Sequence, residues 1–355
     1  MVRMSDVFGG GFKKPEERKP PVSPPPSQQE SVAPPAKPPE LDQRRLQEEA
    51  QTLYREGLSL IGIFFDKVRL EEPLPVEKVR EFVKKTVLFM AGDGDPLLVF
   101  TTGISSGNFL HAHSLNVLII CLKVGLGLRY DKLQLIELGL AAFLHDIGMA
   151  KIPQEILNKT DKLTPEEFEQ VKQHPFYSVS LLEKTREVEP VILSTISQEH
   201  ERLDGSGYPK GIAGEEINPY ARIVGLVDVY EALTHARPYR KHYTPDEAMK
   251  MIVYSTGTSF KPDVVDILKA LARELSLYPV GSYVQLNTKE IGRVLRINKN
   301  FPLLPVVEVL IGPRENKLEE PRQVDLSQEP LLHIKRSVDI LDVMALLKES
   351  ANGSS

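Results

Sequence analysis

The central part of the chain, residues 97–278, consists of long apolar segments separated by short polar breaks. Within these segments apolar residues recur at steps of three and four, the period of a helix with one buried face. We predict helices at 108–126, 131–146, 164–173, 175–185, 188–200, 219–235, 244–254 and 261–274. Because segments this closely spaced can bury their apolar faces only against one another, we expect a mainly α fold built as a multi-helix bundle.

The residues before this region are predicted to form a tail and a helical hairpin. Residues 1–40 are rich in proline and polar residues and cannot bury enough apolar surface to offset the entropy of ordering, so we predict a disordered tail. Helical periodicity predicts a hairpin over 41–96, with helices at 41–70 and 76–90. The first helix carries an apolar stripe formed by Leu46, Ala50, Leu53, Gly57, Ile61, Phe64 and Val68. Either the second helix or another subunit must cover this stripe, and we favour cover within the chain over a homodimer.

After Pro279 the apolar period changes from that of a helix to two, the period of a strand. We predict strands at 283–286, 291–297, 305–310, 323–326 and 331–335, then a short helix near 340–347. Residues 279–355 are therefore expected to form a small β-meander or barrel-like appendage with a C-terminal helix. His333 is expected to be a surface or strand histidine of this appendage.

Composition limits the kind of protein this chain can be. Apolar residues make up 41% of the 355 residues, enough for a sizeable core. The net charge of −5 argues against a general nucleic-acid binder, which usually carries a basic face. The single cysteine, Cys121, lies in an apolar run and is expected to be a buried hydrophobic residue, with no disulfide. We expect no membrane span, because no apolar stretch reaches about 18 residues, and no secretory signal. The protein is predicted to be cytoplasmic.

Histidine and carboxylate side chains lie in or at the ends of the predicted bundle helices. The adjacent pair in the run AFLHDIG comes first, and further candidates occur on other helices: His113, His145, Asp146, His174, Glu199, His200 and Asp228. Each could instead be a core histidine bonded to a carbonyl or a capping aspartate. Asp228 is the most informative, because a carboxylate buried in the run ARIVGLVDVYEAL is costly unless it is hydrogen-bonded or binds a metal. Nitrogen and oxygen ligands without thiolate suit iron, manganese, zinc or magnesium. Asp146 could bridge two such ions about 3.5–4 Å apart, an arrangement that suits phosphoester hydrolysis.

Two further segments are candidates for ligand binding. In the run ERLDGSGYPKG, Gly207 permits a tight turn and Tyr208 offers a flat ring and a hydroxyl. Arg237 and Arg240 follow Asp228, and arginines near a metal site suit phosphate and guanine edges. The alternative for the two arginines is a solvated helix end.

The order HSLNV, HDIG, HPFYS, HERLDGSGYP and DVYEALTHARPYR resembles the HD-GYP domain of the HD phosphohydrolase superfamily, over about residues 97–278. The run YPVGSYVQLN resembles the extension that often follows such domains. The resemblance implies an all-α fold with a di- or trinuclear centre of iron or manganese, and hydrolysis of cyclic di-GMP to pGpG and, in some members, GMP. It implies metal ligands at His113, His145, Asp146, His174, His200 and Asp228. It also implies that Gly207 and Tyr208, with Arg237 and Arg240, hold the dinucleotide.

The chain departs from the family pattern at four positions. Glu199 stands where the family often has a histidine, and glutamate can bind the same ions. Met149 replaces a lysine, so Lys151 joins Asp146 as a catalytic candidate. Ser178 replaces a glycine, which is expected to alter packing more than chemistry. Phe109 stands where members with a third metal carry glutamate, which favours two metal ions.

Three functions are compatible with these residues. The favoured one is a cyclic di-GMP phosphodiesterase. The second is a receptor that binds cyclic di-GMP without turnover and signals to partner proteins through the N-terminal helices or the β-rich appendage. The third is a hydrolase of another nucleotide, such as a mixed cyclic dinucleotide.

Overall fold

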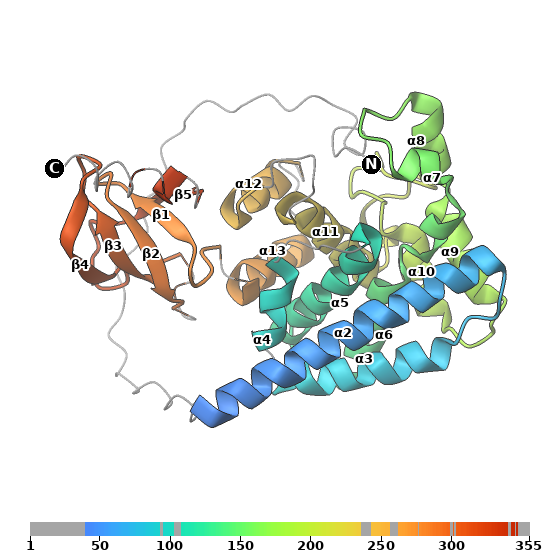
Figure 1. Ribbon diagram of the computed structural model, residues 1–355. Helices are drawn as coiled ribbons and strands as arrows, with labels where there is room; N and C mark the ends of the chain where they lie inside the picture. The colour runs from blue at the N-terminus through green and yellow to red at the C-terminus, as the bar shows by residue number, and fades with distance from the viewer. Residues whose placement is uncertain are drawn as a thin grey trace.

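The computed structural model describes residues 40–92, 95–102, 108–235, 243–255, 262–275, 277–298, 301, 303–339, 342–344 and 346. A body of helices is followed by a small antiparallel sheet near the C-terminus (Figure 1), as predicted. The predicted tail over residues 1–40 lies almost wholly outside the described residues. The helices of the first half are α2 (Glu40–Leu70), α3 (Val76–Ala91), α4 (Asp95–Leu98), η1 (Val99–Thr102), α5 (Phe109–Gly127), α6 (Lys132–Leu144), η2 (Ile147–Lys151) and α7 (Gln154–Leu157). Those of the second half are α8 (Pro165–Val171), α9 (His174–Glu183), α10 (Pro190–Gln198), η3 (Gly214–Glu216), α11 (Pro219–Thr234), α12 (Pro245–Ser255) and α13 (Pro262–Leu275).

The long helix α2 belongs to the same apolar core as the central bundle. One continuous cluster of buried side chains runs from Ala50 on α2 to Leu271 on α13. A Cβ on Gly57 would lie 2.6 Å from the side chain of Leu115 on α5 and 2.7 Å from that of Phe82 on α3. The apolar stripe of α2 is thus covered within the chain, as favoured, although the central bundle contributes as well as α3. A homodimer through these helices remains a prediction.

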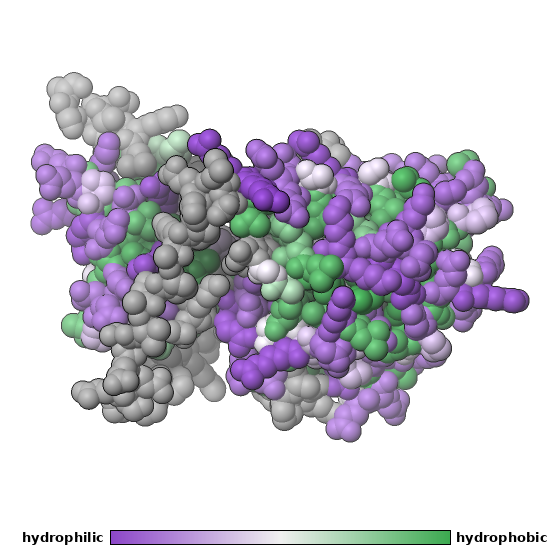
Figure 2. Space-filling view, turned by 90° about the horizontal axis from the view of Figure 1, so that it is seen from below, coloured by the Kyte–Doolittle hydropathy of each residue, from purple (hydrophilic) through white to green (hydrophobic). Residues whose placement is uncertain are grey.

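Helices α5 and α6 form the centre of the bundle. They also show that one premise of the membrane prediction, the absence of apolar stretches of about 18 residues, is wrong. By length and composition, Phe109–Gly127 and Lys132–Lys151 could each cross a membrane, so stretches of span length do exist. However, 72% and 78% of these windows are buried inside the protein, as in core helices of a folded domain. Cys121 on α5 is fully buried, as expected. Polar side chains cover most of the helical surface visible in Figure 2, with apolar patches between them.

Local signals explain where several helices begin and end. The side chain of Asp131 caps α6 and that of Thr164 caps α8, and in each case the backbone amide of the capping residue donates to the side chain three residues on. The predicted helix 131–146 extends two residues too far at its C-terminal end, because α6 ends at Leu144 and the chain turns into η2 after Asp146. Close packing accompanies this turn. A Cβ on Gly148 would lie only 2.1 Å from the carbonyl oxygen of His174, so α9 packs directly against η2.

The C-terminal sheet has five strands in the order β4–β3–β2–β1–β5, with antiparallel neighbours throughout. The strands are β1 (Tyr283–Leu286), β2 (Ile291–Arg296), β3 (Val306–Ile311), β4 (Lys317–Asp325) and β5 (Ile334–Val338). Alternate residues such as Val284, Val294 and Val307 form a separate apolar cluster, which confirms the period-two prediction. His333 is exposed just before β5. The predicted helix at 340–347 is described only at residues 342–344 and 346, which are helical.

Candidate metal centre

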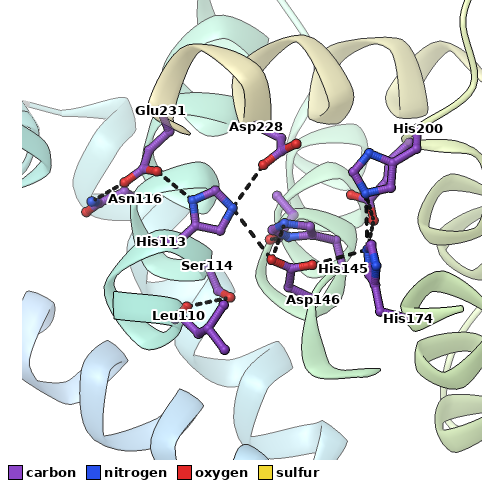
Figure 3. Close-up of polar contacts among 12 residues, drawn as sticks. Leu110, His113, Ser114, Asn116, His145, Asp146, His174, His200, Asp228 and Glu231 are labelled. Carbon is purple, nitrogen blue, oxygen red and sulfur yellow. Dashed lines mark hydrogen bonds and ion pairs between the residues drawn. The ribbon is translucent and has the colours of Figure 1, made fainter. Parts of the chain in front are cut away.

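Five segments of the bundle bring the predicted metal ligands to one place (Figure 3). The donors come from α5, the α6–η2 junction, the first turn of α9, the end of α10 and the middle of α11: His113, His145 and Asp146, His174, Glu199 and His200, and Asp228. These five segments therefore have to pack together before the group exists. His113, His145, Asp146, His174 and Glu199 are all at least nine-tenths buried.

Asp146 lies between two groups of potential ligands. Its Oδ2 is 3.6 Å from Nε2 of His113 and 3.5 Å from Nε2 of His145. Its Oδ1 is 3.3 Å from Nε2 of His174. In the first group, His113, His145 and Asp146 offer ligand atoms within 4.8 Å of one another. One carboxylate thus turns one oxygen toward each group.

The second group consists of His174, Glu199 and His200, whose ligand atoms also lie within 4.8 Å of one another. The Nε2 atoms of the two histidines are 3.1 Å apart. Oε1 of Glu199 is 3.7 Å from Nε2 of His174 and 3.9 Å from that of His200. Glu199, which replaces the histidine expected from the family pattern, therefore faces the same point as its neighbours. Asp228 adds a carboxylate beside the first group, with Oδ1 2.9 Å from Nε2 of His113.

Whether these residues fit a metal ion can be judged from buried polar atoms that lack hydrogen-bond partners. Nε2 of His145 and both carboxylate oxygens of Glu199 are buried and have no hydrogen-bond partner. Leaving such groups unpaired is costly, and a carboxylate is costlier than a neutral group. Coordination to divalent cations would satisfy all three atoms, and the donor set is imidazole and carboxylate. The residues therefore fit a metal centre.

Hydrogen bonds on the far side of the rings hold their Nε2 atoms toward the centre. Nδ1 of His145 donates to the carbonyl of Ala142, and Nδ1 of His174 donates to that of Val171, both at 2.8 Å. In the neutral rings these bonds leave Nε2 as the unprotonated nitrogen, the form that binds a metal. Such outer partners typically fix the orientation of ligating histidines.

Sequence reasoning missed Glu231, the outer partner of His113. Its Oε2 lies 2.5 Å from Nδ1 of His113, and its Oε1 accepts a hydrogen bond from the Asn116 amide at 2.8 Å. A signal for it was present, because Glu231 lies three residues after Asp228 in an apolar run and so shares its helix face. A second buried carboxylate on that face indicates a polar network.

Burial and neighbouring charges shift the pKa values of the ionisable groups of the centre in different directions. Burial would raise the pKa of Asp146, but the neighbouring imidazoles of His145, His174 and His113 lower it below its usual value. Burial raises the pKa of Glu199 well above its usual range. Burial, followed by the nearby His174, lowers the pKa of His200 to about 3, so this ring is neutral at physiological pH. A neutral imidazole has a lone pair available for a metal.

The loop that carries Gly207 and Tyr208 folds back onto the centre, as the sequence suggested. The ring of Tyr208 stacks on that of His200, with centroids 4.6 Å apart and planes inclined by 24°. A Cβ on Gly207 would lie 2.4 Å from the backbone nitrogen of Arg202, so the close turn needs glycine. Arg237 and Arg240 lie outside the described residues.

Two residues linked to the departures from the family pattern, Lys151 and Ser178, differ from expectation. The structure does not bring Lys151 to the centre, because its ammonium binds Oε1 of Glu71 at the end of α2, at 3.0 Å. Ser178 does more than alter packing. Its hydroxyl donates to the carbonyl of His145 at 2.7 Å and accepts from the amide of Gly148 at 2.8 Å, which ties α9 to the HD turn.

Comparisons with known proteins agree with this fold. Residues 104–264 match the family model of the HD domain, and residues 283–345 match that of a KOW domain associated with the HD domain. The cyclic di-GMP phosphodiesterase PA4108 of Pseudomonas aeruginosa is 30% identical over 282 residues, which cover 79% of this chain and 67% of that protein. The cyclic di-GMP phosphodiesterase PdeB of Borreliella burgdorferi is 30% identical over 206 residues, 58% of this chain and 53% of that protein.

A solved structure gives the same fold. It is titled Bd1817, a HDG"Y"P protein from Bdellovibrio bacteriovorus, and it aligns with a TM-score of 0.52 and 19% identity over 64% of this chain and 71% of that one. A helical bundle with clustered histidines and carboxylates, an HD-domain match and these relatives define the class. The chain belongs to the HD-GYP family of HD-domain proteins.

Proposed function

We propose that this protein is a metal-dependent phosphodiesterase that hydrolyses cyclic di-GMP to pGpG. The observation that carries the proposal is Asp146, which turns one oxygen toward each group of buried ligands. The names of the two curated relatives support the substrate. A second cleavage, of pGpG to GMP, is an extension that the same assay measures.

The proposed centre holds two divalent ions, iron or manganese. His113, His145 and Asp228 would serve one ion, His174, Glu199 and His200 the other, and Asp146 both. Such ions supply Lewis-acid activation of the phosphodiester and of water. The protein contributes ligands whose outer hydrogen bonds already point Nε2 inward. It also contributes a buried setting that excludes bulk solvent from charged groups.

The proposed substrate site adjoins the second group of ligands. Tyr208, stacked on His200, would offer its ring edge and hydroxyl to the substrate. Gly207 lets the loop approach closely enough for this contact. Arg237 and Arg240 are proposed to bind phosphate or guanine on the basis of sequence alone.

The test is turnover by the purified protein reconstituted anaerobically with Fe(II) or Mn(II). We expect conversion of cyclic di-GMP to pGpG, measured by chromatography, and loss of this activity in Asp146→Ala. The control is Asp161→Ala, which removes the carboxylate of an exposed aspartate outside the ligand groups. Absence of turnover in protein shown to contain metal contradicts the proposal.

The second candidate is a cyclic di-GMP receptor without turnover, favoured by Met149 and Glu199 at positions where the family often has lysine and histidine. Binding of cyclic di-GMP with no pGpG, unaffected by Asp146→Ala, would identify it. A panel including mixed cyclic dinucleotides tests the third possibility, another nucleotide substrate. The proposal also includes a division of the chain into residues 1–40, 41–96, 97–278 and 279–355. It further includes a cytoplasmic location, a homodimer and signalling partners.

A further inference from the structure

A chain of hydrogen bonds joins the N-terminal helix α2 to the metal centre. The hydroxyl of Tyr54 on α2 donates to Oδ1 of Asn116 on α5, at 2.9 Å. Nδ2 of Asn116 donates to Oε1 of Glu231 on α11, at 2.8 Å, and Oε2 of Glu231 lies 2.5 Å from Nδ1 of His113. Figure 3 shows Glu231 bridging Asn116 and His113. Four side chains from three helices thus end on one candidate ligand.

The three inner side chains are shielded from solvent, so water is a poor substitute for them, whereas Tyr54 is half-buried. The exposed fractions of Asn116, Glu231 and His113 are 0%, 1% and 4%. The ring of Tyr54 stacks on Phe100, with centroids 5.2 Å apart. Burial, with Glu231 next, raises the pKa of Tyr54 to about 12, so its hydroxyl keeps its proton and can donate.

The two hydrogen bonds of the Asn116 amide, one with Tyr54 and one with Glu231, depend on how the amide is oriented. An asparagine amide can turn over and exchange its oxygen with its nitrogen. The Tyr54 hydroxyl donates to Oδ1, and the amide is held with Nδ2 toward Glu231. In the reversed orientation Oδ1 of Asn116 would face a carboxylate oxygen, and two acceptors would repel each other. The carboxylate of Glu231, which only accepts, sets this orientation, and Tyr54 reinforces it by donating to the other end of the amide.

Glu231 in turn controls how His113 meets the centre. A carboxylate on Nδ1 fixes the ring and makes Nε2 a better donor to a metal. In this structure Nε2 of His113 faces both Asp146 and Asp228. A less firmly held Glu231 would leave the ring less well oriented.

We propose that Tyr54 is a positioning residue of the metal centre, acting through Asn116 and Glu231 on His113. The inference rests on the proposed role of His113 as a metal ligand. Tyr54 precedes residues 104–264, the part of the chain that matches the HD-domain model. The N-terminal helix is thereby coupled to the chemistry and is more than a cover for the bundle.

The experiment compares Tyr54→Phe with Tyr220→Phe in the full chain. Tyr220 is a matched control, because its hydroxyl also donates to a side-chain oxygen, Oε2 of Glu137 at 3.0 Å, outside the ligand groups. The readout is the affinity of metal-depleted protein for Mn(II), measured by the electron paramagnetic resonance of the free ion. We expect Tyr54→Phe to weaken binding by about 3- to 10-fold, less than the 10- to 100-fold typical of a direct outer partner. Tyr220→Phe should leave the affinity for Mn(II) unchanged, although it should lower thermal stability about as much as Tyr54→Phe does.

A double-mutant cycle separates a positioning role from a merely structural one. If Tyr54 acts through Glu231, the variant Tyr54→Phe/Glu231→Gln should bind Mn(II) no more weakly than Glu231→Gln alone. Additive losses, or equal affinities for Tyr54→Phe and Tyr220→Phe, overturn the inference. Mn(II) binding by the wild type without turnover overturns the proposed function alone, whereas absence of Mn(II) binding overturns both.

Discussion

The backbone carbonyl of Glu199 lies directly against Gly225: a Cβ on that glycine would be 2.0 Å from the oxygen. Helix α11 therefore touches the ligand segment that follows α10 through main-chain atoms. Because Glu199 and Asp228 sit on either side of this contact, the spacing of two ligand segments depends on the absence of one side chain.

Replacing Gly225 by alanine should destabilise the protein, because neither backbone can yield without moving a ligand segment. We expect a loss of about 2–3 kcal/mol, as for an overpacked core, measured by urea unfolding. Gly62→Ala is the matched control in α2, since its nearest neighbours, atoms of His111, are 3.4 Å away. In the control, the better helix propensity of alanine should leave stability unchanged or raise it by up to about 1 kcal/mol. Equal effects of the two substitutions would contradict the prediction.

Glu199→Gln should weaken metal binding and leave the metal-free protein equally or more stable. The variant removes a buried carboxyl group whose charged form burial disfavours and whose two oxygens lack partners, so the melting temperature in EDTA should be equal or higher. The rise in melting temperature on adding Mn(II) should shrink, since each tenfold loss of affinity removes about 1.4 kcal/mol of linked stabilisation. Glu201→Gln is the control, because Glu201 is also buried with an unpartnered oxygen but belongs to neither ligand group. A full metal-induced shift in Glu199→Gln would show that Glu199 is not a ligand.

The contact between Arg80 and Glu189 should make stability depend on pH. Burial opposes ionisation of Glu189, but the hydrogen bond and charge of Arg80 lower its pKa below the model-compound value of 4.5. A lowered folded-state pKa gives stability that is present above the unfolded-state pKa and lost as pH falls through the folded-state value. Because Glu189 is 44% exposed, we expect Arg80→Met to cost only about 0.5 kcal/mol at pH 7. The ionic part of this difference should fade below about pH 4.5 in thermal unfolding. A difference that grows on acidification would refute the assignment.

Truncation should separate the tail from the first helix. Deleting residues 1–40 should leave folding and turnover intact, since this segment is predicted to be a linker. Deleting residues 1–75 also removes α2, whose buried residues include Leu53, Ile61, Phe64 and Phe65. Each large apolar side chain contributes about 1.5–3 kcal/mol, so this loss is comparable with the stability of a whole domain. Circular dichroism should show a cooperative transition only in the shorter deletion, and loss of folding in that variant would show that the tail is more than a linker.

Helical periodicity and local caps were sufficient to predict most of the fold. The predicted helix 219–235 is α11 (Pro219–Thr234), and the strand 283–286 is β1 without change. The error at 131–146 arose because the apolar pattern continues through His145, whereas α6 ends where Gly148 must meet α9. Periodicity does not contain that tertiary contact.

The site was predictable to the extent that its residues differ from their surroundings. Asp228 in an apolar run and the adjacent His145 and Asp146 are conspicuous in sequence, and the structure brings them together. Lys151 was predicted from its nearness to the HD pair, but the turn of η2 directs it to Glu71. Tyr54 could not have been found, because it lies 62 residues before Asn116 and only packing of α2 on α5 joins them.

The contact between Gly148 and the carbonyl of His174 bears on size selectivity toward ions. Two ligand segments meet there through main-chain atoms, with no side chain between them that could be shortened. Ser178 fastens the same junction by bonding both His145 and Gly148. An ion of different radius must then be accommodated by rotation of ligand side chains, because the segments cannot move closer together. A search for variants with altered ion preference should vary Glu199 and leave Gly148 untouched.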